Sequence, residues 1–193
     1  MTSPEVDGAQ LQVPVGDGDH AQGPSTASVT LVEYGDYECP HCTSVHPIIK
    51  ALQQRFGGQL RFVFRNFPLT EIHQQALHAA EAAESVGAHA GEGAFWAMHD
   101  AIYERRQDSD TALSDRHLLE YAAAAGADPD VVARDLQADA QQTRVRADFK
   151  GGVRSGVNGT PTFFVNGTRF DGDWTDIEKF ARALARSGAS ATG

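Results

Sequence analysis

Cysteine is scarce in this sequence: its 193 residues include two, Cys39 and Cys42. Two cysteines can close only one loop, and a bridge between such close positions restricts the unfolded chain very little, so a purely structural disulfide is disfavoured. A closed zinc site usually takes four ligands in two pairs, and although His41 and His46 lie nearby, no second Cys/His pair of suitable spacing is present. We therefore predict no metal site, and keep zinc binding through Cys39 and Cys42 as a lesser alternative.

Basic charge and long apolar runs are also lacking. The chain has 16 Lys and Arg against 26 Asp and Glu, a formal net charge of -10, and no block of basic residues. The sequence therefore lacks the clustered positive charge that is expected of a protein that binds nucleic acid or an anionic membrane. No stretch approaches about eighteen uninterrupted apolar residues, and the start of the chain has neither the basic residues nor the apolar run of a secretory signal. We expect no membrane insertion and a cytoplasmic protein, with export as the alternative if this is a processed form.

Length and composition fit one ordinary globular domain. Residues 1–27 are rich in Gly, Ser, Asp and Gln and contain no Lys or Arg. They are predicted to form a flexible acidic tail, apart from a short strand over residues 11–15. A short tail is expected over residues 188–193 as well.

A strand, a helix and a second strand are predicted after residue 28. Residues 29–34 are short, apolar and rich in β-branched side chains, which favours a buried strand. From Pro40 an apolar stripe of helical spacing runs to Phe56 and stops at Gly57-Gly58. Residues 60–64 resemble the first strand. This order predicts a βαβ unit with parallel strands.

The remaining pattern is helical and then returns to β structure. Residues 71–157 read as helices throughout. Strands are predicted at 162–165 and 168–170, joined at Asn166-Gly167, whose residues tolerate the positive φ angles of a tight hairpin. Thr175 and Glu178 have capping-box spacing ahead of a final amphipathic helix.

Together these features resemble the thioredoxin fold, and Cys39-Pro40-His41-Cys42 with the inserted helices is similar to the DsbA-type thiol-disulfide oxidoreductases. The resemblance covers residues 28–187. It rests on that motif, on Thr160-Pro161 and on the strand, hairpin and helix at the end. Pro47 also stands where thioredoxin-fold proteins carry a helix-kinking proline.

The resemblance implies an α/β fold in which helices flank a central mixed β-sheet. Residues 28–68 and 158–187 are expected to form the thioredoxin-like domain, and residues 69–157 an inserted helical subdomain between its βαβ and ββα halves. It also implies a cis peptide bond before Pro161.

Cys39 is expected to be the attacking sulfur. At the N-terminus of a helix, unpaired N–H groups and the positive end of the helix dipole stabilise a thiolate, so its pKa should fall below about 8.5. Its sulfur should be the exposed one, whereas Cys42 lies a turn inside and resolves the mixed disulfide. Pro40 suits the first helical turn. His41 can donate a hydrogen bond and, if protonated, adds positive charge beside the thiolate.

Glu33 interrupts an apolar strand six residues before Cys39. It matches the place of a buried acid in DsbA-type proteins, where burial would raise its pKa and suit it to take or relay the proton of Cys42. The alternative is a strand-end glutamate that reaches solvent. Asp36 and Glu38 are expected to face solvent or to shape the groove.

These residues predict a thiol-disulfide oxidoreductase whose only cofactor is its own redox-active disulfide. The backbone of Thr160, beside Pro161, is expected to pair with an extended substrate segment. Expected partners are thiol- or disulfide-bearing proteins, glutathione as a further candidate, and a redox partner protein. The alternative is a non-catalytic peptide-binding module of chaperone type. The direction of electron flow stays open, because a cytosolic setting favours a reductase and export favours disulfide insertion.

Overall fold

The computed structural model describes residues 8–191. Its strands are β1 (His20–Gln22), β2 (Val29–Gly35), β3 (Leu60–Asn66), β4 (Thr162–Val165) and β5 (Thr168–Phe170). Its helices are α1 (Pro40–Phe56), α2 (Ala76–Ala90), α3 (Glu92–Arg105), α4 (Asp115–Ala124), α5 (Pro129–Gln137), α6 (Gln142–Arg154) and α7 (Ile177–Ala191), with a short 3-10 turn, η1 (Gly57–Gln59), after α1. In this part of the chain, no helix is both long and apolar enough to cross a membrane.

The strands form one mixed sheet in the order β1-β3-β2-β4-β5. β2 and β3 are parallel, with α1 as the crossover between them, whereas β1 runs antiparallel to β3, and β4 runs antiparallel to both β2 and β5. Helices α2 to α6 are inserted between β3 and β4. This confirms the predicted thioredoxin-like α/β fold with a helical insertion between its two halves.

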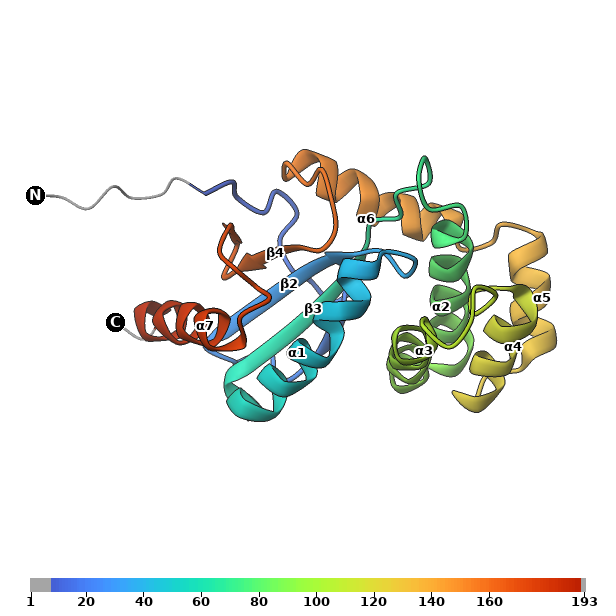
Figure 1. The fold of residues 1–193 in the computed structure, drawn as a ribbon, viewed down its shortest axis with the longest axis horizontal. Coiled ribbons are helices and arrows are strands. Elements are labelled where there is room, and N and C mark those ends of the chain that lie inside the picture. Colours follow the sequence, from blue (N-terminus) through green and yellow to red (C-terminus); the bar gives the residue numbers. More distant parts are fainter. Residues whose placement is uncertain (1–7, 192–193) are drawn as a thin grey trace, which may run out of the picture.

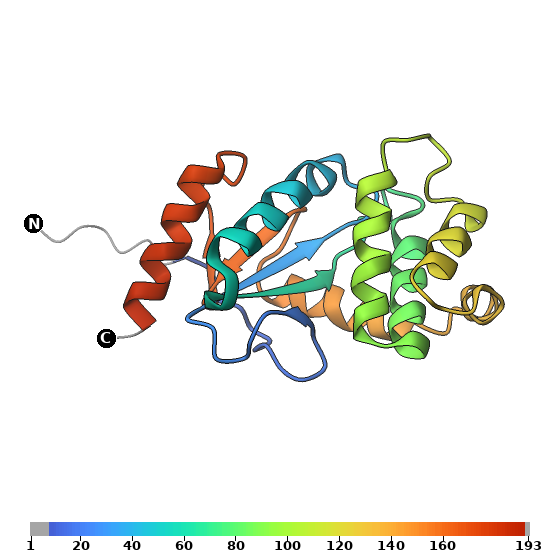
Figure 2. The same cartoon turned by 90° about the horizontal axis from the view of Figure 1, so that it is seen from below.

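Side chains alternate between the two faces of the sheet, and each face has its own cover. Helices α1 and α7 lie on one face, and α6 lies on the other (Figure 1, Figure 2). The core beneath α1 and α7 includes the strand residues Leu31, Phe62, Phe64, Phe163 and Val165, and the opposite core includes Val32, Tyr34, Val63 and Phe164. Because Glu33 follows Leu31 by two residues, its carboxyl lies on the α1 face.

The inserted helices gather beyond one end of the sheet, at the right of Figure 1, and α2 lies at their centre. It contacts α3, α4, α5 and α6. Its small alanine side chains let these neighbours approach closely; the buried ones are Ala76, Ala79, Ala80, Ala82 and Ala83. Helix α6 then returns beside the sheet, where a β-carbon on Gly152 would lie 2.7 Å from the ring of Phe67, so a glycine permits the contact.

The expectation of a flexible tail over residues 1–27 is wrong for residues 8–27, and residues 1–7 lie outside the described part of the chain. β1 pairs antiparallel with the outer edge of β3, and Gln10 forms an isolated bridge with Thr168 of β5. Leu11 and Val15, which the sequence placed in a short strand, pack against the core beside α6 without forming one.

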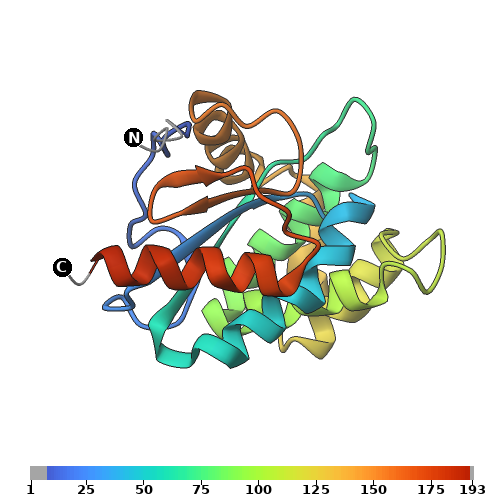
Figure 3. The same cartoon turned by 60° about the vertical axis from the view of Figure 1, so that its left-hand side comes forward.

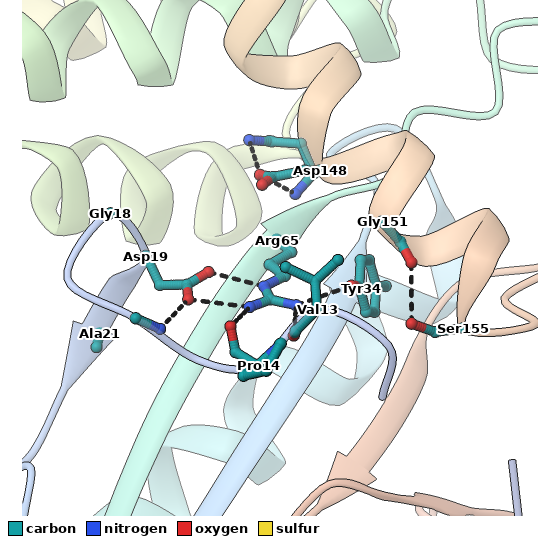
Figure 4. Close-up of polar contacts among 12 residues, drawn as sticks. Val13, Pro14, Gly18, Asp19, Ala21, Tyr34, Arg65, Asp148, Gly151 and Ser155 are labelled. Carbon is teal, nitrogen blue, oxygen red and sulfur yellow. Dashed lines mark hydrogen bonds and ion pairs between the residues drawn. The ribbon is translucent and has the colours of Figure 1, made fainter. Parts of the chain in front are cut away.

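The anchor of this N-terminal segment is Arg65, a β3 side chain that exposes 3% of its surface (Figure 4). Its Nε donates to Asp19 Oδ1 at 2.7 Å, and its Nη atoms donate to the carbonyl oxygens of Val13 and Pro14 at 2.8 and 3.1 Å. Another bond goes to the Tyr34 hydroxyl at 3.0 Å. A buried guanidinium needs acceptors for its donors, and the segment supplies them.

The predicted C-terminal tail also differs from the structure. Helix α7 continues through residues 188–191, so the part of that tail that the structure describes is helical (Figure 3). Asp176, rather than Thr175, caps the helix, because its carboxylate accepts from the backbone N–H groups of Glu178 and Lys179 at 3.0 and 3.1 Å.

Candidate active site

The two cysteines lie where β2 passes into α1. Cys39 is the N-cap of α1, with an extended backbone (φ -68°, ψ 122°), and Pro40 is the first helical residue. The cap carbonyl already accepts from Thr43 N–H at 3.1 Å. The N–H groups of His41 and Cys42 have no earlier carbonyl to bond within the helix, so they are free to point at the Cys39 sulfur.

The Cys39 sulfur faces the loop before β4. Its Sγ lies 3.4 Å from the carbonyl oxygen of Thr160, to which Cys39 donates when it is protonated, and the Thr160–Pro161 peptide bond is cis. Cys39 exposes 3% of its surface and Cys42 none. Cys39 is therefore the more exposed of the two cysteines, in the expected order, but both residues are buried.

The pKa values of the two thiols move in opposite directions. A hydrogen bond from the Cys42 thiol, with backbone N–H groups of Cys42 and His41, lowers the pKa of Cys39 to about 5 against the opposing effect of burial. Burial raises the pKa of Cys42 well above its ordinary value, and its hydrogen bond to Cys39 and the Glu33 charge raise it further. One sulfur is therefore a thiolate at neutral pH and the other stays protonated.

Glu33 lies beneath this pair on β2, between Phe64 of β3 and Phe163 of β4. It exposes 3% of its surface, which rules out the alternative of a glutamate that reaches solvent. Its Oε1 has no hydrogen-bond partner among the described residues. Burial, with a smaller contribution from the Cys39 charge, raises the pKa of this carboxyl to about 8, so it is mostly protonated at neutral pH.

The rim of the site is more open. Pro40 and His41 are exposed, whereas Thr160 and Pro161 are half-buried. The His41 ring meets the half-buried indole of Trp174 edge-on, with centroids 6.3 Å apart. The sequence alone gives no sign of this contact, because no local pattern connects Trp174 with a motif more than a hundred residues earlier.

Of the two alternatives predicted for Asp36, facing solvent is ruled out, because the residue exposes 1% of its surface. Its carboxylate accepts from the N–H groups of Glu38 and Leu69 at 2.7 and 2.8 Å and contacts His73 Nδ1 at 2.8 Å. Glu38 in turn accepts from Gln75 N–H at 2.6 Å. These bonds hold the loop between β3 and α2 against the segment that leads to Cys39, so Asp36 organises the wall of the site instead of facing solvent.

Neither cysteine belongs to a cluster of metal ligands. Among the described residues, the one group of three such side chains with ligand atoms within 4.8 Å of one another is His46, His99 and Asp100. The alternative of zinc bound through Cys39 and Cys42 therefore finds no third ligand in this part of the chain.

A thioredoxin family model matches residues 16–185 of the chain. The chain belongs to the thioredoxin family. Oxidised BdbD from Bacillus subtilis is similar in structure, with a TM-score of 0.84 and 24% identity over 95% of this chain and 99% of that one. The thiol-disulfide exchange protein alpha-DsbA2 from Wolbachia pipientis has a TM-score of 0.70 and 24% identity over 86% and 85% of the two chains. This thioredoxin-family protein therefore has the DsbA-type fold that the sequence predicted.

Similarity in sequence also extends to longer proteins. The Na(+)/H(+) antiporter NhaA 1 of Salinispora arenicola is 42% identical over 175 residues, which make up 90% of this chain and 26% of that antiporter. The thioredoxin-family chain spans about a quarter of the length of the curated relatives that it matches.

Proposed function

We propose that this protein is a thiol-disulfide oxidoreductase in which Cys39 is the nucleophile, Cys42 the resolving thiol, and their disulfide the redox-active group. The observation that carries the proposal is the position of Cys39 as the N-cap of α1, with its sulfur 3.4 Å from the Thr160 carbonyl oxygen and Cys42 buried inside the helix. This position accounts for the opposite directions of the two pKa shifts, to about 5 for Cys39 and well above its ordinary value for Cys42. A thiolate attacks disulfides and is also the better leaving group. The same asymmetry makes Cys39 the sulfur that exchanges with substrates.

The reaction in the oxidising direction has two displacements. A substrate thiolate attacks Cys39 Sγ of the disulfide, the bond between the two cysteines breaks, and Cys42 leaves as a thiolate that takes up a proton. A second substrate thiolate then attacks the substrate sulfur of the mixed disulfide and expels Cys39 as a thiolate. Two electrons pass from the substrate to the cysteine pair. The reductase direction is the reverse, with Cys39 attacking first and Cys42 resolving.

Glu33 is proposed to exchange the proton of Cys42. Its electrostatic effect on Cys42 indicates proximity, and the absence of a hydrogen-bond partner for Oε1 among the described residues leaves that oxygen available. With a pKa of about 8, the carboxyl carries a proton at neutral pH. It is therefore suited to protonate the departing Cys42 thiolate, and its ionised form accepts the proton in reverse.

The remaining site residues are proposed to bind and orient the substrate. The Thr160 backbone, next to Pro161, lies 3.4 Å from the attacking sulfur through its carbonyl oxygen, and an extended peptide that pairs with it brings its own sulfur to Cys39. Pro40 begins the helix that stabilises the thiolate, and His41 stands exposed beside Cys39 as a hydrogen-bond donor. The proposed partners are thiol- or disulfide-bearing proteins and a redox partner protein, with glutathione as a small-thiol candidate.

The low pKa of Cys39 supports the oxidising direction. Stabilisation of the thiolate stabilises the reduced form, and a stable reduced form makes the disulfide the stronger oxidant. We therefore propose a disulfide donor wherever the reduced protein is reoxidised.

The test is the redox equilibrium of the pair against glutathione, on metal-stripped protein, with free thiols alkylated and counted by mass. We expect the pair to stay largely reduced in mixtures that leave glutathione partly oxidised. A distinctly more reducing pair would assign disulfide reduction instead, and a pair that never equilibrates would refute the function. A double variant, Cys39→Ser with Cys42→Ser, is the control for the chaperone alternative, because peptide binding alone needs neither sulfur.

A further inference from the structure

A second cluster of reactive side chains begins one turn after Cys42 along α1, where that helix meets α3. His46 of α1 exposes 8% of its side chain, and its Nε2 lies 3.5 Å from Asp100 Oδ1 of α3. Neither atom has a hydrogen-bond partner among the described residues. His99 adds a buried imidazole, and the ligand atoms of the three side chains lie within 4.8 Å of one another.

Two polar atoms at the centre of this cluster, His46 Nε2 and Asp100 Oδ1, are left without partners in the described part of the chain, because Lys50 contacts the other carboxylate oxygen of Asp100. Two imidazole rings and a carboxylate oxygen converge at this point. Buried polar atoms without a hydrogen-bond partner lower the stability of the folded protein unless a proton or a metal ion lies between them.

We propose that His46, His99 and Asp100 bind a Zn²⁺ ion. Zinc takes imidazole and carboxylate ligands at about 2.0–2.2 Å, which places two ligands of a tetrahedral site about 3.4 Å apart. The observed 3.5 Å between His46 Nε2 and Asp100 Oδ1 fits that separation. Calcium and magnesium prefer all-oxygen sites, so two imidazoles select a transition metal. Three protein ligands leave the fourth position to water or an exogenous ligand.

The surroundings support and expose such a site. Tyr37 Oη lies 3.0 Å from His99 Nδ1, the kind of outer contact that orients a ligating imidazole through its other nitrogen. A surface hollow of about 550 Å³ includes His46, Lys50 and Tyr103 in its lining, so it reaches one edge of the cluster. Lys50 Nζ holds the other carboxylate oxygen of Asp100 at 2.7 Å, so its positive charge opposes metal binding.

The site is separate from the dithiol and does not rest on the proposed function. The test uses the Cys39→Ser, Cys42→Ser double variant, which removes the competing sulfurs. Zinc affinity is measured by competition with a chromophoric chelator, and Co²⁺ is added as a spectroscopic probe. We expect one equivalent of zinc, and visible Co²⁺ bands without a thiolate charge-transfer band.

In that background, His46→Gln and Asp100→Asn should each weaken zinc binding by about 100-fold or more, because changes outside the ligand shell already cost about 10–100-fold. Lys50→Gln should tighten binding, since it removes the opposing charge. The matched control is His78→Gln with Asp115→Asn, an exposed His–Asp pair at 2.6 Å, which should leave the affinity unchanged.

Three results would overturn the site: no stoichiometric zinc in the double variant, binding kept in both ligand variants, or an equal loss in the His78/Asp115 control. Circular dichroism and the unfolding midpoint check that each variant folds. If His46→Gln does not fold, Asp100→Asn and Lys50→Gln, both at half-buried positions, decide the question through their opposite effects.

Discussion

The Cys39 thiolate should make the stability of the reduced protein depend on pH, and acidification is the perturbation that tests it. The pKa of Cys39 falls from the ordinary value of 9.0 to about 5 on folding. A lowered pKa means that the unfolded state binds the proton more tightly. The stabilising contribution is therefore fully present above pH 9 and is lost as the pH falls through about 5.

The size of the effect follows from the same two values. At pH 7, two pH units above the folded pKa, the thiolate contributes about 2.7 kcal/mol to the free energy of unfolding, and at pH 5 it contributes about 0.4 kcal/mol. The oxidised protein has no thiolate. The reduced form should therefore lose about 2.3 kcal/mol relative to the oxidised form between pH 7 and pH 5. In redox terms, 2.7 kcal/mol makes the pair more oxidising by about 60 mV.

The assay is chemical denaturation of both redox forms at pH 5, 6 and 7, with the thiolate absorbance of the reduced protein followed over the same range. The oxidised form is the control for Glu33, because it contains the same carboxyl and no thiolate. The raised pKa of Glu33 gives a contribution to the free energy of unfolding that is present below pH 4.5 and is lost as the pH rises through about 8, opposite in sign to that of Cys39. Burial is the larger cause of the Glu33 shift and does not depend on the Cys39 charge, so we expect most of its effect to cancel in the difference. A stability difference that is constant from pH 5 to pH 7, or a thiolate midpoint near 9, would refute the reasoning.

Other predictions concern single side chains. Cys39→Ser should abolish exchange with small disulfides, and full activity of this variant would contradict the role of Cys39 as the nucleophile. Cys42→Ser should accumulate mixed disulfides that mass spectrometry detects, and the absence of any trapped species would contradict the role of Cys42 as the resolving thiol. Glu33→Gln should remove the fall in the oxidation rate of a reduced peptide as the pH rises through about 8, and an unchanged pH profile would take Glu33 out of the proton transfer. Arg65→Gln should cost about 3–5 kcal/mol in denaturant unfolding. Its control, Arg116→Gln on an exposed pair, should cost less than about 1 kcal/mol, and equal costs would show that Arg65 is no anchor.

The parts of the fold that the sequence predicted correctly depend on neighbours in the chain. The alternating and helical periods placed β2, α1, β3 and the final hairpin close to their observed bounds. Asn166 and Gly167 have φ angles of 48° and 86°, as the hairpin turn requires. Each of these signals lies within a window of a few residues, which is the range over which backbone preference acts.

The incorrect expectations depend on partners far along the chain. Residues 8–27 contain little apolar surface, and composition alone therefore predicts disorder. Their order comes from Arg65, 46 residues beyond Asp19, whose buried donors require acceptors. Asp36 is buried for a similar reason, since the loop that supplies Leu69 and His73 is fixed only when the sheet and the insertion come together.

The same contrast, between signals from neighbouring residues and contacts between distant ones, separates the cysteine pair from the His46 cluster. Cys39 and Cys42 were recognisable because four consecutive residues contain the whole motif and its position at a helix start. His46 lies one turn after Cys42 on the same helix, but its partners, His99 and Asp100, lie on α3, more than fifty residues later in the chain. One helix therefore carries a thiolate at its N-terminus and a proposed metal ligand one turn later. Because linkage is reciprocal, any factor by which disulfide formation changes zinc affinity is also the factor by which zinc changes the redox equilibrium.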